Sequence, residues 1–380
     1  MITEIQIENY KSIQTLKMNL GRVNVFIGEN GCGKSNILEA IALASAAANN
    51  KLDNEYLVPR GIRVVEPQFM RSAFDKEKLI EPIKIIIQSG AIFNCVLNHD
   101  NKPYSKWENT YEIGPTQEEV IRFMEQNKLK KLPMEDVSAA NDLISQIMQI
   151  GRGHYSQHVN LMRFLVYAPE NTSLRKLEEE GQIEPLGIKG NGLLKLLQVL
   201  SKEENLEQIS EIKERLELLD WFEDFEIPDG AFDSERNIKL KDRYLDEDIP
   251  WFDQRSANEG FLFLLFYFTL FISDYTPKFF AIDNIDASLN PKLCRRLIKD
   301  LVELAKKHDK QVIFTTHNPA ILDGLNLDDD DQRLFAIHRN VSGHTKAKRI
   351  LKPQPLEGQK SVKMSEAFMR GYIGGLPEGF

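Results

Sequence analysis

Cysteine is scarce in this sequence, with only three among 380 residues, at Cys32, Cys95 and Cys294. The three are odd in number and far apart, and their spacing is not that of metal ligands. A disulfide framework is therefore not expected. Free thiols in a reducing cytoplasm are the expectation instead.

Long apolar runs and a secretory signal are also missing. The longest apolar run, from Phe261 to Ile272, is shorter than the ~20 residues that a membrane-spanning helix requires, and it predicts a buried helix. The first residues, MITEIQIENY, lack the basic start and apolar core of a secretory signal. We therefore expect a cytoplasmic protein without a membrane partner.

Positive charge is not in excess. The chain has 48 basic and 57 acidic residues and a net charge of −9, which does not favour a protein that coats nucleic acid. Runs of like charge usually form solvated faces, so DNA contact stays open only as an alternative. The densest runs are basic at 344–349, Lys128 to Lys131 and Arg295–Arg296, and acidic at Asp328 to Asp331.

What the sequence does contain is an alternation of apolar strands and helices. Its 42% hydrophobic and 28% charged residues are typical of a globular protein. Strands that alternate with helices predict an α/β fold, with a mainly parallel sheet covered by helices on both faces. Strands are expected at 22–28, 164–171, 279–282, 311–317 and 334–338, and helices at 34–48, 261–272 and 291–308.

Other stretches predict additional elements. The strands 82–88 and 91–98 flank Ser89–Gly90 and read as a hairpin. Residues 116–150 are expected to be helical, and a single helix is expected from 190 to about 219.

A glycine-rich loop follows the first of the parallel strands. "GENGCGKS", Gly28 to Ser35, matches the pattern G-x-x-x-x-G-K-S, with a strand before it and a helix after it. Backbone N–H groups of such a loop bind phosphate oxygens, Lys34 reaches the phosphates, and the Ser35 hydroxyl can bind Mg²⁺. This context argues against a chance match. The expected ATP-binding residues are Gly28, Glu29, Asn30, Gly31, Cys32, Gly33, Lys34, Ser35 and Asn36.

Two later strands end in residues suited to the same chemistry. Asp283 ends the apolar strand at 279–282, where its carboxylate can face Ser35 and hold Mg²⁺, although a helix-capping aspartate is the alternative. His317 ends the next strand, within "TTHNP", and could hydrogen-bond the γ-phosphate or the attacking water. A structural histidine is the alternative there.

With these motifs the chain resembles the ATP-binding heads of the SMC/RecF-type branch of ABC ATPases. It is most similar to the overcoming-lysogenization-defect-like ATPases of bacterial phage-defence systems. "VNVFIGENGCGKSNILEAI" resembles their Walker A block, "AIDNIDASLNP" their Walker B and D-loop, and "VIFTTHNP" their switch histidine. "ITEIQIENYKSI" resembles their opening strand, and the resemblance covers most of the chain.

The resemblance implies a P-loop NTPase of the ABC-type head fold, with an antiparallel β subdomain and a helical insertion beside the mainly parallel sheet. The whole chain, 1–380, would be one head. Residues 1–100 would form an N-terminal lobe with Walker A and the hairpin, 101–220 a mainly helical insertion, and 221–380 a C-terminal lobe with the other motifs.

The signature loop of these heads, of the type Ser-x-Gly, departs from the pattern here. In the family it precedes a long apolar helix and contacts the ATP held by the partner subunit. The matching residues are Asn258, Glu259 and Gly260, so an amide replaces the usual hydroxyl, with Ser256 close by. A simple helix N-cap is the alternative interpretation.

Asn284 is the second departure, because these enzymes usually carry there the glutamate that activates water. An amide can orient water but cannot take its proton, and losing a general base typically costs ~10²- to 10⁴-fold in rate. Positioning and charge neutralisation would remain. The expected catalytic residues are therefore Lys34, Asp283, Asn284 and His317, acting slowly, with Asp286 as a possible substitute carboxylate.

The resemblance implies a switch with ATP and Mg²⁺ as cofactors. Two heads would form a homodimer around two ATP molecules, with higher oligomers left open, and gate a separate effector, such as a nuclease, in phage defence. The alternatives are a RecF/SMC-like ATPase of DNA repair or chromosomes, and a non-hydrolysing nucleotide-binding scaffold. A transporter subunit is disfavoured, because the glutamine-loop pattern is absent.

Overall fold

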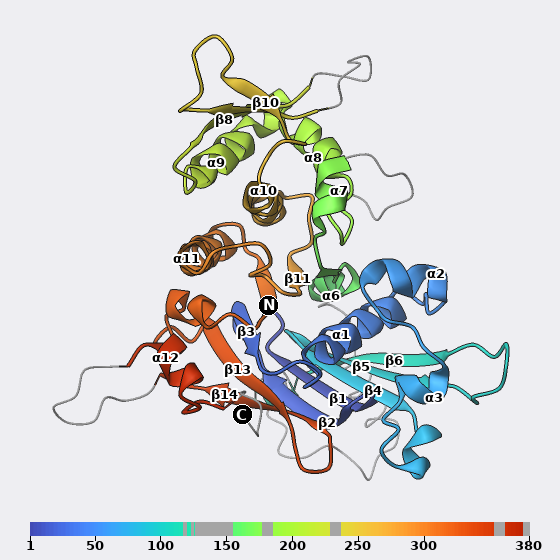
Figure 1. Ribbon diagram of the computed structural model, residues 1–380. Coiled ribbons are helices and arrows are strands. Elements are labelled where there is room, and N and C mark those ends of the chain that lie inside the picture. The colour runs from blue at the N-terminus through green and yellow to red at the C-terminus, as the bar shows by residue number, and fades with distance from the viewer. Residues whose placement is uncertain are drawn as a thin grey trace.

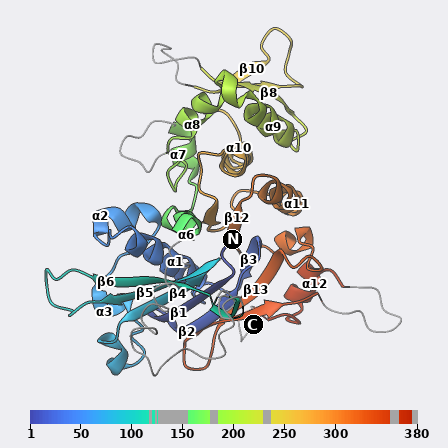
Figure 2. The same cartoon turned by 180° about the vertical axis from the view of Figure 1, so that it is seen from behind.

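The computed structural model describes residues 1–116, 120–122, 125, 155–176, 185–228, 237–352 and 362–374. Three sheets and the helices between them make up this part of the chain. Figures 1 and 2 show from both sides that one end of the molecule holds α7 to α10 and a small sheet, and that the other end holds a five-stranded sheet.

The central sheet has six strands in the order β14-β13-β3-β12-β11-β7. All neighbouring pairs are parallel except β13 and β14, which confirms the mainly parallel sheet. Its strands are β3 (Val23–Ile27), β7 (Val166–Tyr167), β11 (Phe279–Ile282), β12 (Gln311–Thr316), β13 (Gln332–Arg339) and β14 (Thr345–Ile350).

The two faces of the central sheet border two separate cores. Side chains of a strand alternate between faces, so Val25 packs with α10 (Glu259–Ile272) and α11 (Pro291–Lys307), and Phe26 packs with α1 (Lys34–Ala48). The strands β3, β11 and β12 are buried along their whole length, as expected for a sheet covered on both faces.

The second large sheet is antiparallel, in the order β2-β1-β4-β5-β6, and lies on the other side of α1. The hairpin around Ser89–Gly90 is confirmed. Two of these strands, β2 and β6, were not predicted. The strand β2 was missed because only Ile13, Leu16 and Met18 of its seven residues are buried. The strands are β1 (Glu4–Tyr10), β2 (Ile13–Asn19), β4 (Ile83–Gln88), β5 (Ala91–Asn98) and β6 (Glu108–Pro115).

The single helix predicted from 190 to about 219 is wrong. The chain forms α8 (Leu193–Leu200), a 3₁₀ turn (Glu203–Asn205) and α9 (Leu206–Leu216) instead. One straight helix over this stretch would be about 45 Å long. The break lets the apolar faces of both α8 and α9 pack against α10, which is buried on all sides beyond its first turn.

The remaining elements are short. Only Val166–Tyr167 of the strand predicted at 164–171 forms a strand, β7, and the helix α7 (Asn171–Lys176) already begins at Asn171. The other elements are the small sheet β8 (Phe222–Glu226), β9 (Lys239–Asp242) and β10 (Trp251–Asp253), the helices α2 (Asn54–Leu57), α3 (Pro67–Met70), α6 (Tyr155–Met162) and α12 (Met364–Met369), and 3₁₀ turns at Val58–Arg60, Lys76–Leu79 and Pro319–Gly324.

Some predictions are not tested by this structure. The helix expected at 116–150 and the basic run Lys128 to Lys131 lie almost wholly outside the described residues. The three-part division of the chain stays a prediction, although β6 lies beyond residue 100 and belongs to the antiparallel sheet. In the part of the chain that the structure describes, no helix is long and apolar enough to cross a bilayer.

Candidate phosphate-binding site

The loop Gly28–Ser35 connects β3 to α1 at the carboxyl edge of the central sheet. Two of its glycines are required by close packing. A Cβ atom at Gly28 would lie 2.1 Å from the carbonyl oxygen of Ile337, and one at Gly33 would lie 2.1 Å from Oγ1 of Thr345. Gly33 also has a φ of 107°, which glycine adopts without strain. The loop conformation therefore depends on these two residues.

Carbonyl groups of this loop are held by side chains. Thr345 Oγ1 donates to Cys32 O over 2.8 Å, and Lys34 Nζ donates to Gly28 O over 2.9 Å and to Glu29 O over 3.0 Å. Lys34 is only 6% exposed, and burial lowers the pKa of its ammonium group. Burial also raises the pKa of the Cys32 thiol, which disfavours the reactive thiolate.

Asp283 and Ser35 meet across the central sheet. The Ser35 hydroxyl donates to Asp283 Oδ2 over 3.2 Å, while Thr315 Oγ1 donates to the other carboxylate oxygen. Adjacent ligands of an octahedral Mg²⁺ ion are about 3 Å apart, so these two oxygens fit neighbouring positions around one ion. The pair predicted to hold the metal is thus brought together by the parallel order β3-β12-β11.

Asn284 lies at the rim of this site. It is exposed, and its φ of 55° is in the left-handed region, which asparagine tolerates better than most residues. Asp286, two residues on, accepts a hydrogen bond of 2.5 Å from Thr316 Oγ1. Asn284 lines the pocket described below and Asp286 does not, so the geometry does not favour Asp286 as a substitute base.

His317 follows β12 and faces the phosphate loop. Burial and the nearby charge of Lys34 lower the pKa of its imidazole, and the carboxylates of Asp286 and Asp283 and a hydrogen bond to the backbone of Gly28 oppose this only in part. The ring is therefore neutral at pH 7, so that one of its nitrogens donates a hydrogen bond and the other accepts one.

We expect the imidazole of His317 to titrate below pH 6.5 in the protein alone. Binding of Mg²⁺·ATP should raise this pKa, because phosphate charge favours the imidazolium. Between the lowered pKa and 6.5 the unfolded chain binds more protons, so stability decreases as the pH falls through this window. An NMR titration of the ring protons measures the pKa, and His317→Ala identifies the signal among seven histidines. A pKa above 6.5 without nucleotide would contradict this assignment.

Residues of the phosphate loop, together with Asp283, Asn284 and His317, line one pocket of about 260 Å³. Two arginines in its wall were not predicted, because neither belongs to a motif. Arg63 Nη2 donates to Asn36 Oδ1 over 2.9 Å, and Arg339 Nε donates to Gly31 O over 2.8 Å. The full lining is Asn30, Gly31, Gly33, Lys34, Ser35, Asn36, Arg63, Asp283, Asn284, His317 and Arg339.

A second pocket of about 430 Å³ adjoins the first and shares Asn36, Arg63 and Arg339 with it. Its own wall is largely apolar and includes the exposed side chains of Phe69 and Phe74. A ligand with a phosphate chain and a flat apolar group could therefore occupy both pockets at once.

The residues matched to the signature loop lie elsewhere. Asn258 is the N-cap of α10, and its Oδ1 accepts a hydrogen bond from the N–H of Phe261 over 2.8 Å. Glu259 accepts a hydrogen bond of 2.7 Å from Ser288 Oγ, and Gly260 has ordinary space around it. None of the three lines the phosphate pocket of its own chain. Their contact with a partner's nucleotide stays a prediction.

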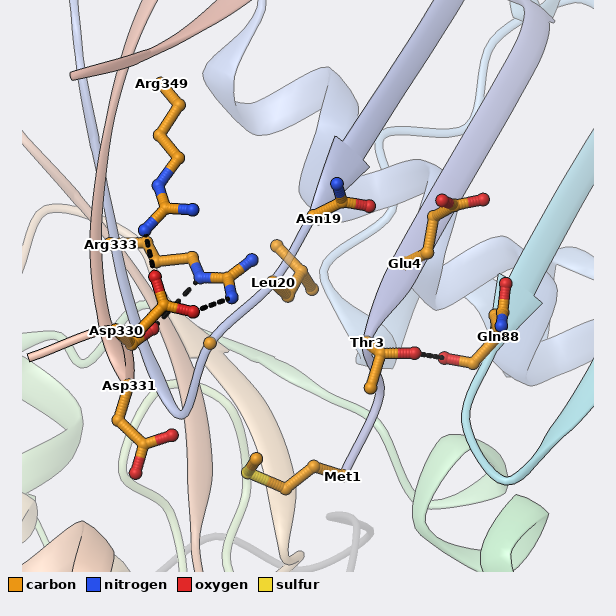
Figure 3. A pocket seen from close by; sticks show the side chains of 11 residues that line it. Met1, Thr3, Glu4, Asn19, Leu20, Gln88, Asp330, Asp331, Arg333 and Arg349 are labelled. Atoms are coloured by element: carbon orange, nitrogen blue, oxygen red, sulfur yellow. Dashed lines mark hydrogen bonds and ion pairs between the residues drawn. The ribbon is translucent and has the colours of Figure 1, made fainter. Parts of the chain in front are cut away.

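Asp328 and Asp330 in the acidic run are exposed, as predicted for a solvated loop, and their carboxylates also pair with basic side chains. Figure 3 shows Asp330 between Arg333, 2.7 Å away, and Arg349, beside a pocket of about 410 Å³. Asp328 likewise pairs with Lys352. Within 344–349, Arg349 is the one residue that the described part of the chain shows in an ion pair, and its partner is the exposed carboxylate of Asp330.

Comparisons with known proteins agree with this geometry. A model of the AAA ATPase domain family matches residues 1–322. RecF, the DNA replication and repair protein, is 42% identical over 55 residues in Bacillus mycoides (strain KBAB4) and 40% identical over 55 residues in Bacillus cereus (strain B4264). Each match covers 14% of this chain and 15% of the relative, so the chain matches only a small part of RecF.

Solved structures with a similar fold are SMC heads. A head bound to the C-terminal winged-helix domain of ScpA aligns with a TM-score of 0.54 and 16% identity, covering 92% of this chain and 98% of that one. A head with an extended coiled coil, bound to the C-terminal domain of ScpA from Pyrococcus furiosus, aligns with a TM-score of 0.51 and 16% identity, covering 92% and 96%. The chain therefore has the fold of an SMC head.

Proposed function

Because the chain belongs to the family of AAA ATPase domains, we propose that it binds Mg²⁺·ATP at the loop Gly28–Ser35 and hydrolyses it slowly. The observation that carries this proposal is the meeting of Lys34, Ser35 and Asp283 in one pocket. Lys34 and the loop amides would neutralise the phosphates, and Ser35 and Asp283 would hold Mg²⁺, which supplies further positive charge. The apolar pocket beside Phe74 would take the nucleoside.

Slow turnover follows from Asn284. Its amide can orient the attacking water but cannot accept the proton, and His317, which lines the same pocket, would hydrogen-bond the γ-phosphate or that water. A nucleotide that stays bound for long suits a switch better than a motor. We propose that the ATP-bound form is the signal that a partner reads.

The position of Asn258 supports a dimer. It is exposed at the N-terminus of α10, where the helix dipole favours an anion, yet it lies outside the phosphate pocket of its own chain. We propose that two heads close so that each Asn258 meets the nucleotide bound by the other. A ligand buried between two copies makes the dimer state depend on nucleotide.

We expect Mg²⁺·ATP to shift the protein from the 43.7 kDa protomer to twice that mass in light-scattering chromatography. Asn258→Asp should abolish this shift, because it keeps the N-cap acceptor of α10 but sets a negative charge against the partner's phosphates. Asn258→Ser, which also keeps the cap, should dimerise. The proposal fails if Asn258→Asp dimerises as wild type does.

We further propose a cytoplasmic switch that gates a separate effector, such as a nuclease, in phage defence. Among the described residues there is no group of three or more side chains that could hold a metal ion, and we propose that the effector lies outside this part of the chain. SMC heads in the similar structures are bound to ScpA, a separate protein, which makes a bound partner reasonable here. Purification from native cells with and without ATP, followed by mass determination, tests for such a partner.

The second candidate is a RecF-like ATPase of DNA repair or chromosomes, which the 55-residue similarity to RecF favours. That function requires DNA binding that weakens steeply with salt. A filter-binding titration of the isolated protein at two salt concentrations distinguishes the two. Phosphate release over hours distinguishes both from a scaffold that binds ATP without hydrolysing it.

A further inference from the structure

Arg339 stands at the junction of the two pockets described above. It is the last residue of β13, it is exposed, and it lines both the phosphate pocket and the apolar pocket. Its Nε donates to Gly31 O, and its guanidinium carbon lies 6.0 Å from the centre of the Phe74 ring. One residue thus touches the phosphate loop and the apolar wall.

The charge of Arg339 is available to a ligand. In the part of the chain that the structure describes, no carboxylate lies within ion-pair distance of Arg339. Arg63, the other arginine at the junction, is already paired with the buried carboxylate of Glu39 and bonded to Asn36. Arg339 also has four N–H donors besides the one bonded to Gly31, since a guanidinium carries five.

We propose that Arg339 is a nucleotide-binding residue that contacts the phosphate next to the ribose of a nucleoside di- or triphosphate. This inference rests on the proposed function. The terminal phosphate of ATP would lie near Asp283 and His317, and the base would lie beside Phe74. The phosphate joined to the sugar must then pass the junction that Arg339 lines. A guanidinium fits phosphate oxygens by paired hydrogen bonds.

Arg339 lies beyond the part of the chain that matches the family model, which ends at residue 322. Thr345, which also bonds the phosphate loop, lies beyond it as well. The last strands of the central sheet therefore complete the nucleotide site in this protein.

Two substitutions separate phosphate contact from support of the loop. The side-chain nitrogen of glutamine is attached to the same carbon as the Nε of arginine, so Arg339→Gln can keep the hydrogen bond to Gly31 while losing the charge. Arg339→Ala loses both. The control is Arg333→Gln, on the same strand but paired with Asp330 at a different pocket (Figure 3).

We expect both Arg339→Gln and Arg339→Ala to weaken the binding of Mg²⁺·ADP and of Mg²⁺·ATP by at least about tenfold, as measured by calorimetry. Arg333→Gln should bind like wild type. Thermal unfolding without nucleotide should show that all three variants are folded.

Three results would overturn the inference. If Arg339→Gln bound ADP as wild type does, the role of Arg339 would be limited to supporting the loop at Gly31. Both variants could bind normally, which would leave it no role. A loss confined to ATP would place the guanidinium at the terminal phosphate instead. If the wild-type protein bound neither nucleotide, the proposed function itself would fail. If Lys34→Ala lost ATP binding while Arg339→Gln bound both nucleotides normally, only this inference would fail.

Discussion

Lys34→Ala is expected to weaken Mg²⁺·ATP binding by at least about 100-fold, the largest effect on affinity that we foresee. The ammonium group is buried beneath the phosphate loop, where it bonds Gly28 O and Glu29 O. A charged donor in such a site contributes more than an exposed one, because water does not compete for it. Isothermal calorimetry with Mg²⁺·ATP measures the loss directly.

The control for this variant is Lys306→Ala. Lys306 pairs with Asp329 on the surface, 2.6 Å away, and its removal should change neither ATP affinity nor fold. Loss of Lys34 also removes one hydrogen-bond donor from each of two loop carbonyls, so circular dichroism and thermal unfolding must accompany the titration. Normal ATP affinity in folded Lys34→Ala would refute the phosphate site and every proposal built on it.

Asn284→Glu is expected to raise the single-turnover rate of ATP hydrolysis by about 100-fold or more, since it restores a proton acceptor beside the attacking water. The backbone opposes part of this gain. Asn284 has a φ of 55°, where a longer side chain costs roughly 1–2 kcal/mol. Rapid-quench measurement of phosphate release gives the rate.

Asn284→Gln is the matched control, because glutamine has the shape of glutamate and the same backbone cost but no basic oxygen. Only the carboxylate should accelerate hydrolysis, and Asn284→Gln should be as slow as wild type or slower. Wild-type turnover near the typical enzyme value of about 10 s⁻¹ would contradict slow hydrolysis, and with it the role of Asn284 as the limiting residue.

The phosphate loop could be predicted because its signal is local. The residues Gly28 to Ser35 carry their own conformational requirement, and the flanking strand and helix are visible as an apolar run and an alanine-rich stretch. Asp283 and His317 could be placed because parallel strands end at the same edge of a sheet. Each of these inferences needs only a short window of sequence and one rule.

The failures involve contacts between distant parts of the chain. The break between α8 and α9 was missed because it depends on how both helices meet α10. The strand β6 was missed because none of its residues is buried and its place is set by pairing with β5. Local pattern does not report either contact.

Local sequence was sufficient to predict the α/β class, the phosphate loop and the strand ends that carry Asp283 and His317, because glycine geometry and apolar periodicity are properties of neighbouring residues. Only the tertiary structure brought Arg63 and Arg339 to the loop, since these arginines belong to no motif and reach Gly31 and Asn36 through the packing of separate elements. It also placed Arg333 and Arg349 beside the exposed carboxylate of Asp330. A side chain's role depends on which charges surround it, and chain folding alone fixes those neighbours.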